Sequence, residues 1–241
     1  MDLDLKGRGV IVTGGSRGIG RAIADVLAAE GANVALAARD PDRLRQAARE
    51  IEAAHGVRAV PISYDIRDGA SVDRMTAEAA DALGRVDALI NNGAPSGGAG
   101  TSATGLTDEY VLENLNAKTV GYLRCVRAVL PLMRKQGYGR IVNVAGMAAR
   151  HAGAIPGGMR NAAVAVMAKA VSLGEGRRGI AVTTIHPGGT HTGRADILRW
   201  QGAGPRRVAA RDVAYVAAFL ASPRAAPLTG ETLSVSAGGR V

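Results

Sequence analysis

The chain has 241 residues, and its 47% hydrophobic content is enough for a buried core, which excludes a disordered or fibrous protein. Its 30 Lys and Arg residues exceed its 21 Asp and Glu residues, giving a formal net charge of +9. Only four of the basic residues are lysines, and the arginines are spread along the chain without interleaved aromatic residues. The charge therefore reflects an arginine-rich composition, and we expect no nucleic-acid partner.

The sequence also argues against a membrane-spanning protein and against a metal-binding site. No apolar run approaches the roughly 18 residues that span a bilayer, and the start of the chain is acidic where a signal peptide would be basic. The single cysteine, Cys125, excludes an intrachain disulfide and a cysteine-based metal cluster. We therefore expect a cytoplasmic protein with no membrane partner and no metal site.

Short apolar segments alternate with amphipathic, alanine-rich segments in chain order. The former predict strands at residues 9–13, 33–38, 58–63, 87–91, 139–144, 179–186 and 232–236. The latter predict helices at residues 18–30, 41–55, 70–83, 107–134, 158–173 and 212–221. This alternation is typical of βαβ units, so it predicts an α/β fold. We expect one doubly wound Rossmann-type domain over residues 1–241, with a parallel seven-stranded sheet, helices on both faces and a substrate flap at about 189–208.

A glycine-rich loop follows the first predicted strand and opens the first predicted helix. Residues 13–20 read Thr-Gly-Gly-Ser-Arg-Gly-Ile-Gly. Gly14 permits a tight turn, Gly18 lets the backbone approach a pyrophosphate, and Gly20 lets the helix pack closely on the sheet. The helix N-terminus offers free N–H groups and a positive dipole end to phosphates. The loop predicts a dinucleotide site, to which Ser16, Arg17 and Ile19 also belong.

The residue after the second predicted strand distinguishes between the two dinucleotides. An NAD site would place Asp or Glu there to bind the ribose 2′-hydroxyl. This chain has Arg39 instead, and Arg39 together with Arg17 is suited to pair with a 2′-phosphate. The sequence therefore favours NADP(H). In a chain so rich in arginine, however, an arginine can also stand at this position by chance.

Further motifs follow in a fixed order: Asn91-Asn92-Gly93-Ala94, Pro187-Gly188 with Thr192, the segment Thr229-Gly230-Glu231-Thr232-Leu233, and Gly238-Gly239. Together with the loop at 13–20, they resemble the short-chain dehydrogenase/reductase family over nearly the whole chain. The resemblance implies further cofactor contacts from Asp65, Ile66, Asn91, Gly93, Pro187, Gly188, Thr190 and Thr192. It also implies a homodimer or homotetramer formed through the helices at 107–134 and 158–173.

The family's reaction uses a serine, a tyrosine, a lysine four residues after the tyrosine, and an asparagine. None of the five tyrosines of this chain has a lysine four residues later. At the positions that resemble the family's serine, tyrosine, lysine and asparagine, this chain has Gly146, Gly157, Asn161 and Lys118, respectively. If the alignment has a gap in the loop before this helix, Met159 and Ala163 stand at the tyrosine and lysine positions instead. The sequence therefore predicts an atypical member that lacks the usual proton relay.

Three residues are candidates for replacement chemistry. A lysine in a partly dry pocket acts as an acid, a base or an electrostatic stabiliser, so Lys118 is the first candidate, unless it faces solvent. Tyr122 lies one helical turn further and shares its face. His151, in the loop after the fifth predicted strand, titrates near neutral pH, although a loop histidine can equally be surface. His186 is interpreted as structural, and His191 as a contact to cofactor phosphate or substrate.

Three functions fit these observations. The first is an NADP(H)-binding enzyme that runs a cyclisation, elimination or isomerisation on a small carbonyl-bearing metabolite. The second is an NADPH-dependent carbonyl reductase with a substitute proton donor. The third is a catalytically silent nucleotide-binding subunit, because fold does not fix function. The sequence does not identify the substrate.

Overall fold

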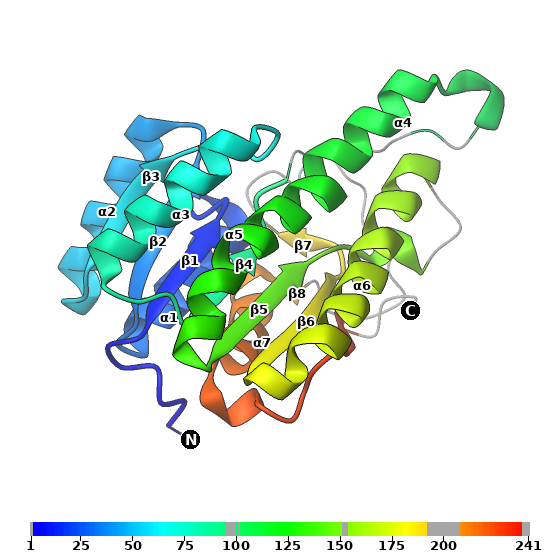
Figure 1. The fold of residues 1–241 in the computed structure, drawn as a ribbon. Helices are drawn as coiled ribbons and strands as arrows, with labels where there is room; N and C mark the ends of the chain where they lie inside the picture. Colours follow the sequence, from blue (N-terminus) through cyan, green and yellow to red (C-terminus); the bar gives the residue numbers. More distant parts are fainter. Residues whose placement is uncertain (1, 95–99, 101, 151–153, 192–207, 238–241) are drawn as a thin grey trace.

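Seven parallel strands form one sheet in the order β3-β2-β1-β4-β5-β6-β9 (Figure 1). The computed structural model describes residues 2–94, 100, 102–150, 154–191 and 208–237. The strands are β1 (Gly9–Thr13), β2 (Asn33–Ala38), β3 (Ala59–Ser63), β4 (Ala88–Asn91), β5 (Gly139–Val144), β6 (Ile180–Pro187) and β9 (Thr232–Val235). The strand order reverses between β1 and β4, which is where open α/β sheets bind ligands at their carboxyl edge. The predicted doubly wound sheet is confirmed.

The helices cover both faces of this sheet (Figure 1). One face packs against α1 (Gly18–Ala29), α2 (Pro41–His55) and α7 (Ala210–Ala221), and the other against α3 (Gly69–Leu83), α5 (Gly121–Gln136) and α6 (Ile155–Glu175). Each face has its own apolar core. In α1, for example, Ile23, Val26 and Leu27 recur at helical spacing and are buried against the sheet.

The helix predicted at 107–134 contains an interruption that the sequence did not indicate. It consists of α4 (Asp108–Leu115) and α5, joined by a π-helical turn at Asn116–Val120. Figure 1 shows α4 extending past the carboxyl edge of the sheet, beyond the end of α5. A π-helical turn adds a residue to the helix and frequently marks a functional site. Here, the turn contains Lys118.

Two short strands were not predicted from the sequence. β7 (Thr190–His191) pairs in parallel with β8 (Val208–Ala209), at the two ends of the predicted flap. Each has only two residues, too few to show an alternating pattern. Residues 192–207 of the flap lie outside the described residues.

A buried ionic cluster holds the amino edge of the sheet together. Asp87 is fully buried and accepts hydrogen bonds from the backbone N–H of Gly9 (2.9 Å), from Arg8 (3.1 Å) and from Arg85 (2.5 and 2.6 Å). The guanidinium groups of Arg8 and Arg140 lie 4.6 and 4.4 Å from the centroid of the Tyr138 ring. A buried carboxylate needs such partners. The cluster therefore fixes the starts of β1, β4 and β5 relative to one another.

In the described part of the chain, no helix is both long and apolar enough to cross a membrane. Those same residues contain no group of three or more His, Cys, Asp or Glu side chains arranged to hold a metal ion. Cys125 is a free thiol on α5, and burial raises its pKa to about 12. It is therefore an inert core residue.

Candidate functional site

The glycine-rich loop is tied to the loop after β4 by hydrogen bonds at the carboxyl edge of the sheet. The Thr13 hydroxyl accepts bonds from the N–H groups of Asn92 and Gly93, both at 2.9 Å, and donates to the carbonyl of Ile90 at 3.2 Å. The Asn92 amide donates to the Thr13 carbonyl at 3.1 Å. The two loops thus form one rigid wall at the point where the strand order reverses.

This wall leaves no room for side chains on its glycines. A Cβ atom on Gly20 would lie 2.2 Å from the Gly14 carbonyl oxygen and 2.5 Å from the Asn92 amide nitrogen. A Cβ atom on Gly93 would lie 2.6 Å from the Gly14 nitrogen. Gly14 and Gly18 have φ values of +68° and +59°, which favour glycine. The loop therefore keeps its shape only with glycine at these positions, and it turns the N-terminus of α1 toward the sheet edge.

A cavity of about 890 Å³ opens in front of this loop. The predicted cofactor residues that line it are Gly14, Ser16, Arg17, Gly18, Ile19, Arg39, Asp65, Ile66 and Gly93. Gly20 and Asn91 are buried behind it, and Asn91 donates a hydrogen bond to Asn143 at 3.0 Å. Pro187, at the end of β6, and Thr190, which donates a hydrogen bond to the Gly188 carbonyl at 2.8 Å, are not among the residues that line the cavity.

Four arginines and two aspartates set the charge of this cavity. Arg43 pairs with Asp40 at 3.1 Å, and Arg67 pairs with Asp65 at 2.9 Å. The hydrogen bonds from Arg67 and the nearby charge of Arg39 hold the pKa of Asp65 below its usual range. Because two arginines balance the two aspartates, Arg17 and Arg39 leave the cavity with an excess of positive charge. This excess, with the free N–H groups of α1, fits a dinucleotide that carries an extra phosphate.

The sequence did not predict Arg43 and Arg67 as cavity residues. Arg43 follows Asp40, which caps α2 and accepts a hydrogen bond from the Arg43 N–H at 3.1 Å. That capping pattern is visible in the sequence and puts Arg43 in the first turn of α2, and both Arg39 and Arg43 line the cavity. Arg67 also reaches Glu113 on α4 at 3.2 Å, a contact between residues 46 positions apart that no local pattern predicts.

Lys118 lies in the π-helical turn, at the carboxyl edge beside the end of β5. Its amine donates a hydrogen bond to the Ala145 carbonyl at 2.7 Å, and the residue is only 6% exposed. Burial, with a smaller contribution from the charge of Arg160, lowers the pKa of Lys118 to about 7. The solvent-facing alternative is therefore excluded, and the amine can gain or lose a proton near neutral pH.

Tyr122 lies next to Lys118, as the helical spacing predicted, but it belongs to the core. The Lys118 amine is 5.7 Å from the centroid of its ring. The Tyr122 hydroxyl is fully buried and donates to the Val144 carbonyl at 3.0 Å, and burial raises its pKa above the ordinary value. We therefore do not retain Tyr122 as a proton donor.

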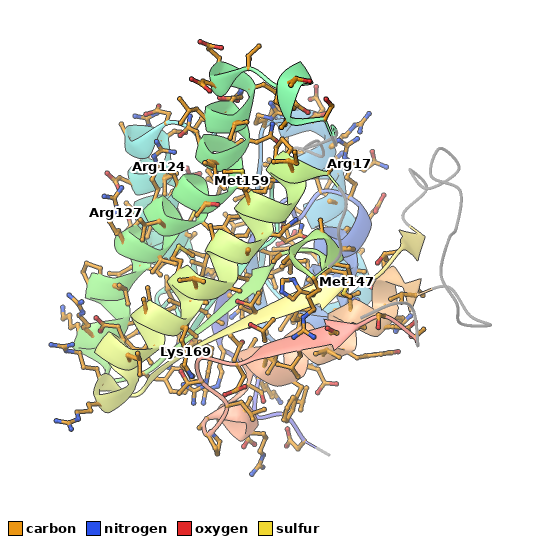
Figure 2. All side chains as sticks on the ribbon, turned by 90° about the vertical axis from the view of Figure 1, so that its right-hand side faces the viewer. Arg17, Arg124, Arg127, Met147, Met159 and Lys169 are labelled. Carbon is orange, nitrogen blue, oxygen red and sulfur yellow. The ribbon has the colours of Figure 1, made fainter. Side chains whose placement is uncertain are left out.

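The structure brings Gly146 and Asn161 together. A Cβ atom on Gly146 would lie 3.1 Å from the Asn161 amide nitrogen, and that nitrogen donates to the Gly157 carbonyl at 2.8 Å. Asn161 is buried, whereas Met159 is 46% exposed on α6 (Figure 2). The assignment of Asn161 and Gly157 to the family's lysine and tyrosine positions stays a prediction. Neither glycine offers a hydroxyl to a substrate.

His186 supports the same peptide group that Lys118 contacts. It is 1% exposed, and its Nδ1 atom accepts a hydrogen bond from the Gly146 N–H at 3.2 Å. Lys118 binds the carbonyl of the Ala145–Gly146 peptide and His186 binds its N–H. Burial and the charges of Arg150 and Lys118 lower the pKa of His186 to about 4. The side chain is therefore neutral at pH 7, in agreement with the structural role expected for it.

We expect His186 to destabilise the protein in acid. Its pKa is about 4 when folded and about 6.5 when unfolded, so the unfolded chain binds more protons between these values. Stability should fall by roughly 2 kcal/mol from pH 6.5 to pH 4.5 on account of this residue. The measurement is urea unfolding at both pH values for the wild type and for His186→Asn, whose amide oxygen can still accept the Gly146 N–H. An equal loss in both proteins would contradict the assignment.

Several predicted residues have no described position. His151 and Thr192 lie outside the described residues, so His151 stays a prediction. His191 is paired with Ala209 in the short two-stranded sheet. The positions that the structure does bring together are therefore Lys118, Gly146, Gly157 and Asn161, with His186 beside them.

Comparisons with known proteins agree with this architecture. The sequence pattern of the short chain dehydrogenase family matches residues 8–201. The 3-oxoacyl-(acyl-carrier-protein) reductase of Escherichia coli is 32% identical over 254 residues, which cover 98% of each chain. A short chain dehydrogenase from Burkholderia cenocepacia, solved with NADP, is 33% identical with a TM-score of 0.86 over 97% of this chain and 98% of that one. L-Sorbose reductase from Gluconobacter frateurii, solved with NADPH and L-sorbose, is 27% identical with a TM-score of 0.90 over 99% and 98%. The chain therefore belongs to the short-chain dehydrogenase family.

Proposed function

We propose that the protein is an NADPH-dependent reductase of a small carbonyl compound, in which Lys118 supplies the proton. The cofactor is NADP(H), because the cavity combines the glycine loop with the excess charge of Arg17 and Arg39. The reductase assignment is supported by relatives that are themselves named reductases, including the Escherichia coli protein and L-sorbose reductase. The observation that carries the role of Lys118 is its buried amine, 2.7 Å from the Ala145 carbonyl.

The reaction needs a proton as well as a hydride. When bound, NADPH supplies the hydride to the carbonyl carbon. The carbonyl oxygen then becomes an alkoxide, which must be protonated. A lysine with a pKa of about 7 is suited to this transfer at neutral pH, because both of its protonation states are populated. Lys118 would donate from its ammonium form, and the Ala145 carbonyl would hold the amine in place.

A second function is favoured by a separate observation. No tyrosine of the chain precedes a lysine by four residues, and Gly146 and Gly157 provide no hydroxyl beside Asn161. A cleft without this relay suits a cyclisation, elimination or isomerisation, in which the nucleotide contributes only structure or charge. Such a reaction would consume no NADPH.

One experiment separates these functions. The protein is incubated with NADPH and a panel of small ketones and aldehydes, and the absorbance of the reduced nicotinamide is followed. We expect its oxidation, with kcat lowered at least ~100-fold in Lys118→Met. Lys169→Met is the matched control, since Lys169 is exposed on α6 (Figure 2). Product formed equally with NADP⁺ and NADPH would favour the second function, and nucleotide binding without any product would favour a silent subunit.

We expect Arg39 to determine the preference for NADP(H). Arg39→Ala should weaken the binding of NADP⁺ by roughly 10-fold to 100-fold, because a charge-assisted contact to the 2′-phosphate contributes about 1.5–3 kcal/mol. Binding of NAD⁺, which lacks this phosphate, should change little. Titration calorimetry with both nucleotides checks this expectation. Equal weakening of the two would show that Arg39 does not contact the 2′-phosphate.

A further inference from the structure

The wall of the cofactor cavity beside Arg39 contains a carboxylate. Asp40 follows Arg39 directly, and both residues line the cavity, as does Arg43 from the first turn of α2. In proteins that bind NAD, a carboxylate near the end of the second strand accepts a hydrogen bond from the ribose 2′-hydroxyl. An unpaired carboxylate at this place would also repel the 2′-phosphate of NADP(H). Two neighbouring residues of the wall therefore favour opposite dinucleotides.

Both oxygens of the Asp40 carboxylate are in contact with Arg43. The Oδ1 atom accepts a hydrogen bond from the backbone N–H of Arg43 at 3.1 Å, which caps α2, and the Oδ2 atom pairs with the Arg43 Nε atom at 3.1 Å. The first contact comes from the backbone, so it holds the carboxylate in place whatever side chain stands at position 43. The second contact supplies the opposite charge. The pair as a whole is therefore neutral, although the carboxylate stays in the wall of the cavity.

The ion pair between Asp40 and Arg43 contributes little to the stability of the fold. Both side chains are about half exposed to solvent, and exposed ion pairs add little to the free energy of unfolding. A second exposed pair on α2, Asp42 with Arg45, has the same spacing of three residues, but neither of its members is among the residues that line the cavity. The position in the cavity is what distinguishes the first pair. Its effect is therefore expected on nucleotide binding.

We propose that Arg43 determines the preference for NADP(H) by neutralising Asp40, so that the carboxylate does not repel the 2′-phosphate. In this scheme Arg39 attracts the phosphate directly, whereas Arg43 is a positioning residue that acts through Asp40. The Arg43 side chain also occupies the Oδ2 atom, which would otherwise be available to the 2′-hydroxyl of NAD(H). This inference rests on the proposed contact between Arg39 and the 2′-phosphate, and it does not depend on which reaction the protein catalyses.

The test measures the dissociation constants of NADP⁺ and NAD⁺ by calorimetric titration in the wild type, in Arg43→Gln, in Asp40→Asn and in the double variant. Arg43→Gln keeps the backbone N–H that caps α2, but it leaves the carboxylate without its opposite charge. We expect NADP⁺ to bind about 10-fold more weakly and NAD⁺ about 2-fold to 5-fold more tightly. A general disturbance of the fold would not move the two affinities in opposite directions. The loss for NADP⁺ should decrease at high salt, because half-exposed charges are screened.

The double variant separates an action through Asp40 from a direct contact of Arg43 with the nucleotide. Asparagine caps a helix as well as aspartate does, so Asp40→Asn removes the charge and keeps the cap. The double variant should bind NADP⁺ within about 3-fold of the wild type, because the pair is then removed as a neutral unit. Arg45→Gln, which breaks the second pair on the same helix, is the matched control and should bind both nucleotides as the wild type does.

Three results would overturn the role of Arg43. They are an unchanged affinity for both nucleotides in Arg43→Gln, an equal weakening of both, and a loss for NADP⁺ that stays about 10-fold in the double variant. The last result would mean that Arg43 contacts the phosphate itself. Arg39→Ala distinguishes these failures from a failure of the proposed function. If Arg39→Ala weakens NADP⁺ selectively and Arg43→Gln does not, the 2′-phosphate lies at Arg39 and only the role of Arg43 is wrong. If Arg39→Ala weakens both nucleotides equally, the proposed contact with the 2′-phosphate is wrong.

Discussion

Replacing Gly20 with alanine is expected to weaken the binding of NADP⁺ severely. A Cβ atom there would lie 2.2 Å from the Gly14 carbonyl oxygen and 2.7 Å from the Gly14 carbonyl carbon, and both are backbone atoms that cannot rotate away. The loop must therefore move away from α1, and the N–H groups that would hold the pyrophosphate move with it. We expect a loss of at least ~100-fold in affinity, which corresponds to about 2.7 kcal/mol, measured by calorimetric titration.

A matched substitution shows whether the effect is local. A Cβ atom on Gly174, near the end of α6, would meet nothing within 4 Å. Alanine is favoured over glycine inside a helix by about 1 kcal/mol. Gly174→Ala should therefore bind NADP⁺ as the wild type does and unfold at a slightly higher urea concentration. Near-normal affinity in Gly20→Ala would mean that the loop does not bind the nucleotide in the way proposed.

The substitution Lys118→Met is expected to stabilise the protein, and more strongly in acid than in base. The pKa of Lys118 is about 7 when folded, against about 10.5 when unfolded, so the unfolded chain binds more protons between these values. In the wild type, stability should therefore rise with pH across this window, by roughly 5 kcal/mol in total. Below pH 7, Lys118 is charged in both the folded and the unfolded state, so folding carries the full cost of burying its ammonium group.

Guanidinium unfolding at pH 6 and pH 9 measures this effect. We expect the stabilisation by Lys118→Met to be roughly 2–3 kcal/mol larger at pH 6 than at pH 9. Lys169→Met should change little at either pH, because its side chain is exposed and substitutions on the surface are usually within about 0.5 kcal/mol. The same gain at both pH values would show that Lys118 is not forced to lose its proton on folding.

The fold was predictable because its signals are local. Strands β1, β2 and β5 have the predicted bounds, since each is a short, mostly apolar run that begins at a glycine or an asparagine. The helix predicted at 158–173 is longer, Ile155–Glu175, because Pro156 is accepted in the first turn of a helix. The π-helical turn was missed, since a π turn and an α turn share the same sequence preferences here.

The site was predictable only in part, because burial and long-range contacts decide its chemistry. The spacing showed that Lys118 and Tyr122 share a helix face, but not that the face packs against the end of β5. That packing places the Tyr122 hydroxyl in the core and the Lys118 amine on the Ala145 carbonyl. The position of His186, whose partner Gly146 is 40 residues away, likewise depends on the pairing of β5 with β6.

The ionic cluster around Asp87 has a consequence for how such a protein can change over generations. Asp87, Arg8 and Arg140 secure the amino ends of the strands, whereas Lys118 and Gly146 lie at the carboxyl ends. Because the two edges share no polar contact in the described part of the chain, exchanges at the carboxyl edge leave the anchorage of the sheet intact. Catalytic residues at the carboxyl edge can then be replaced one at a time during evolution. The substrate specificity can therefore change while the fold is kept.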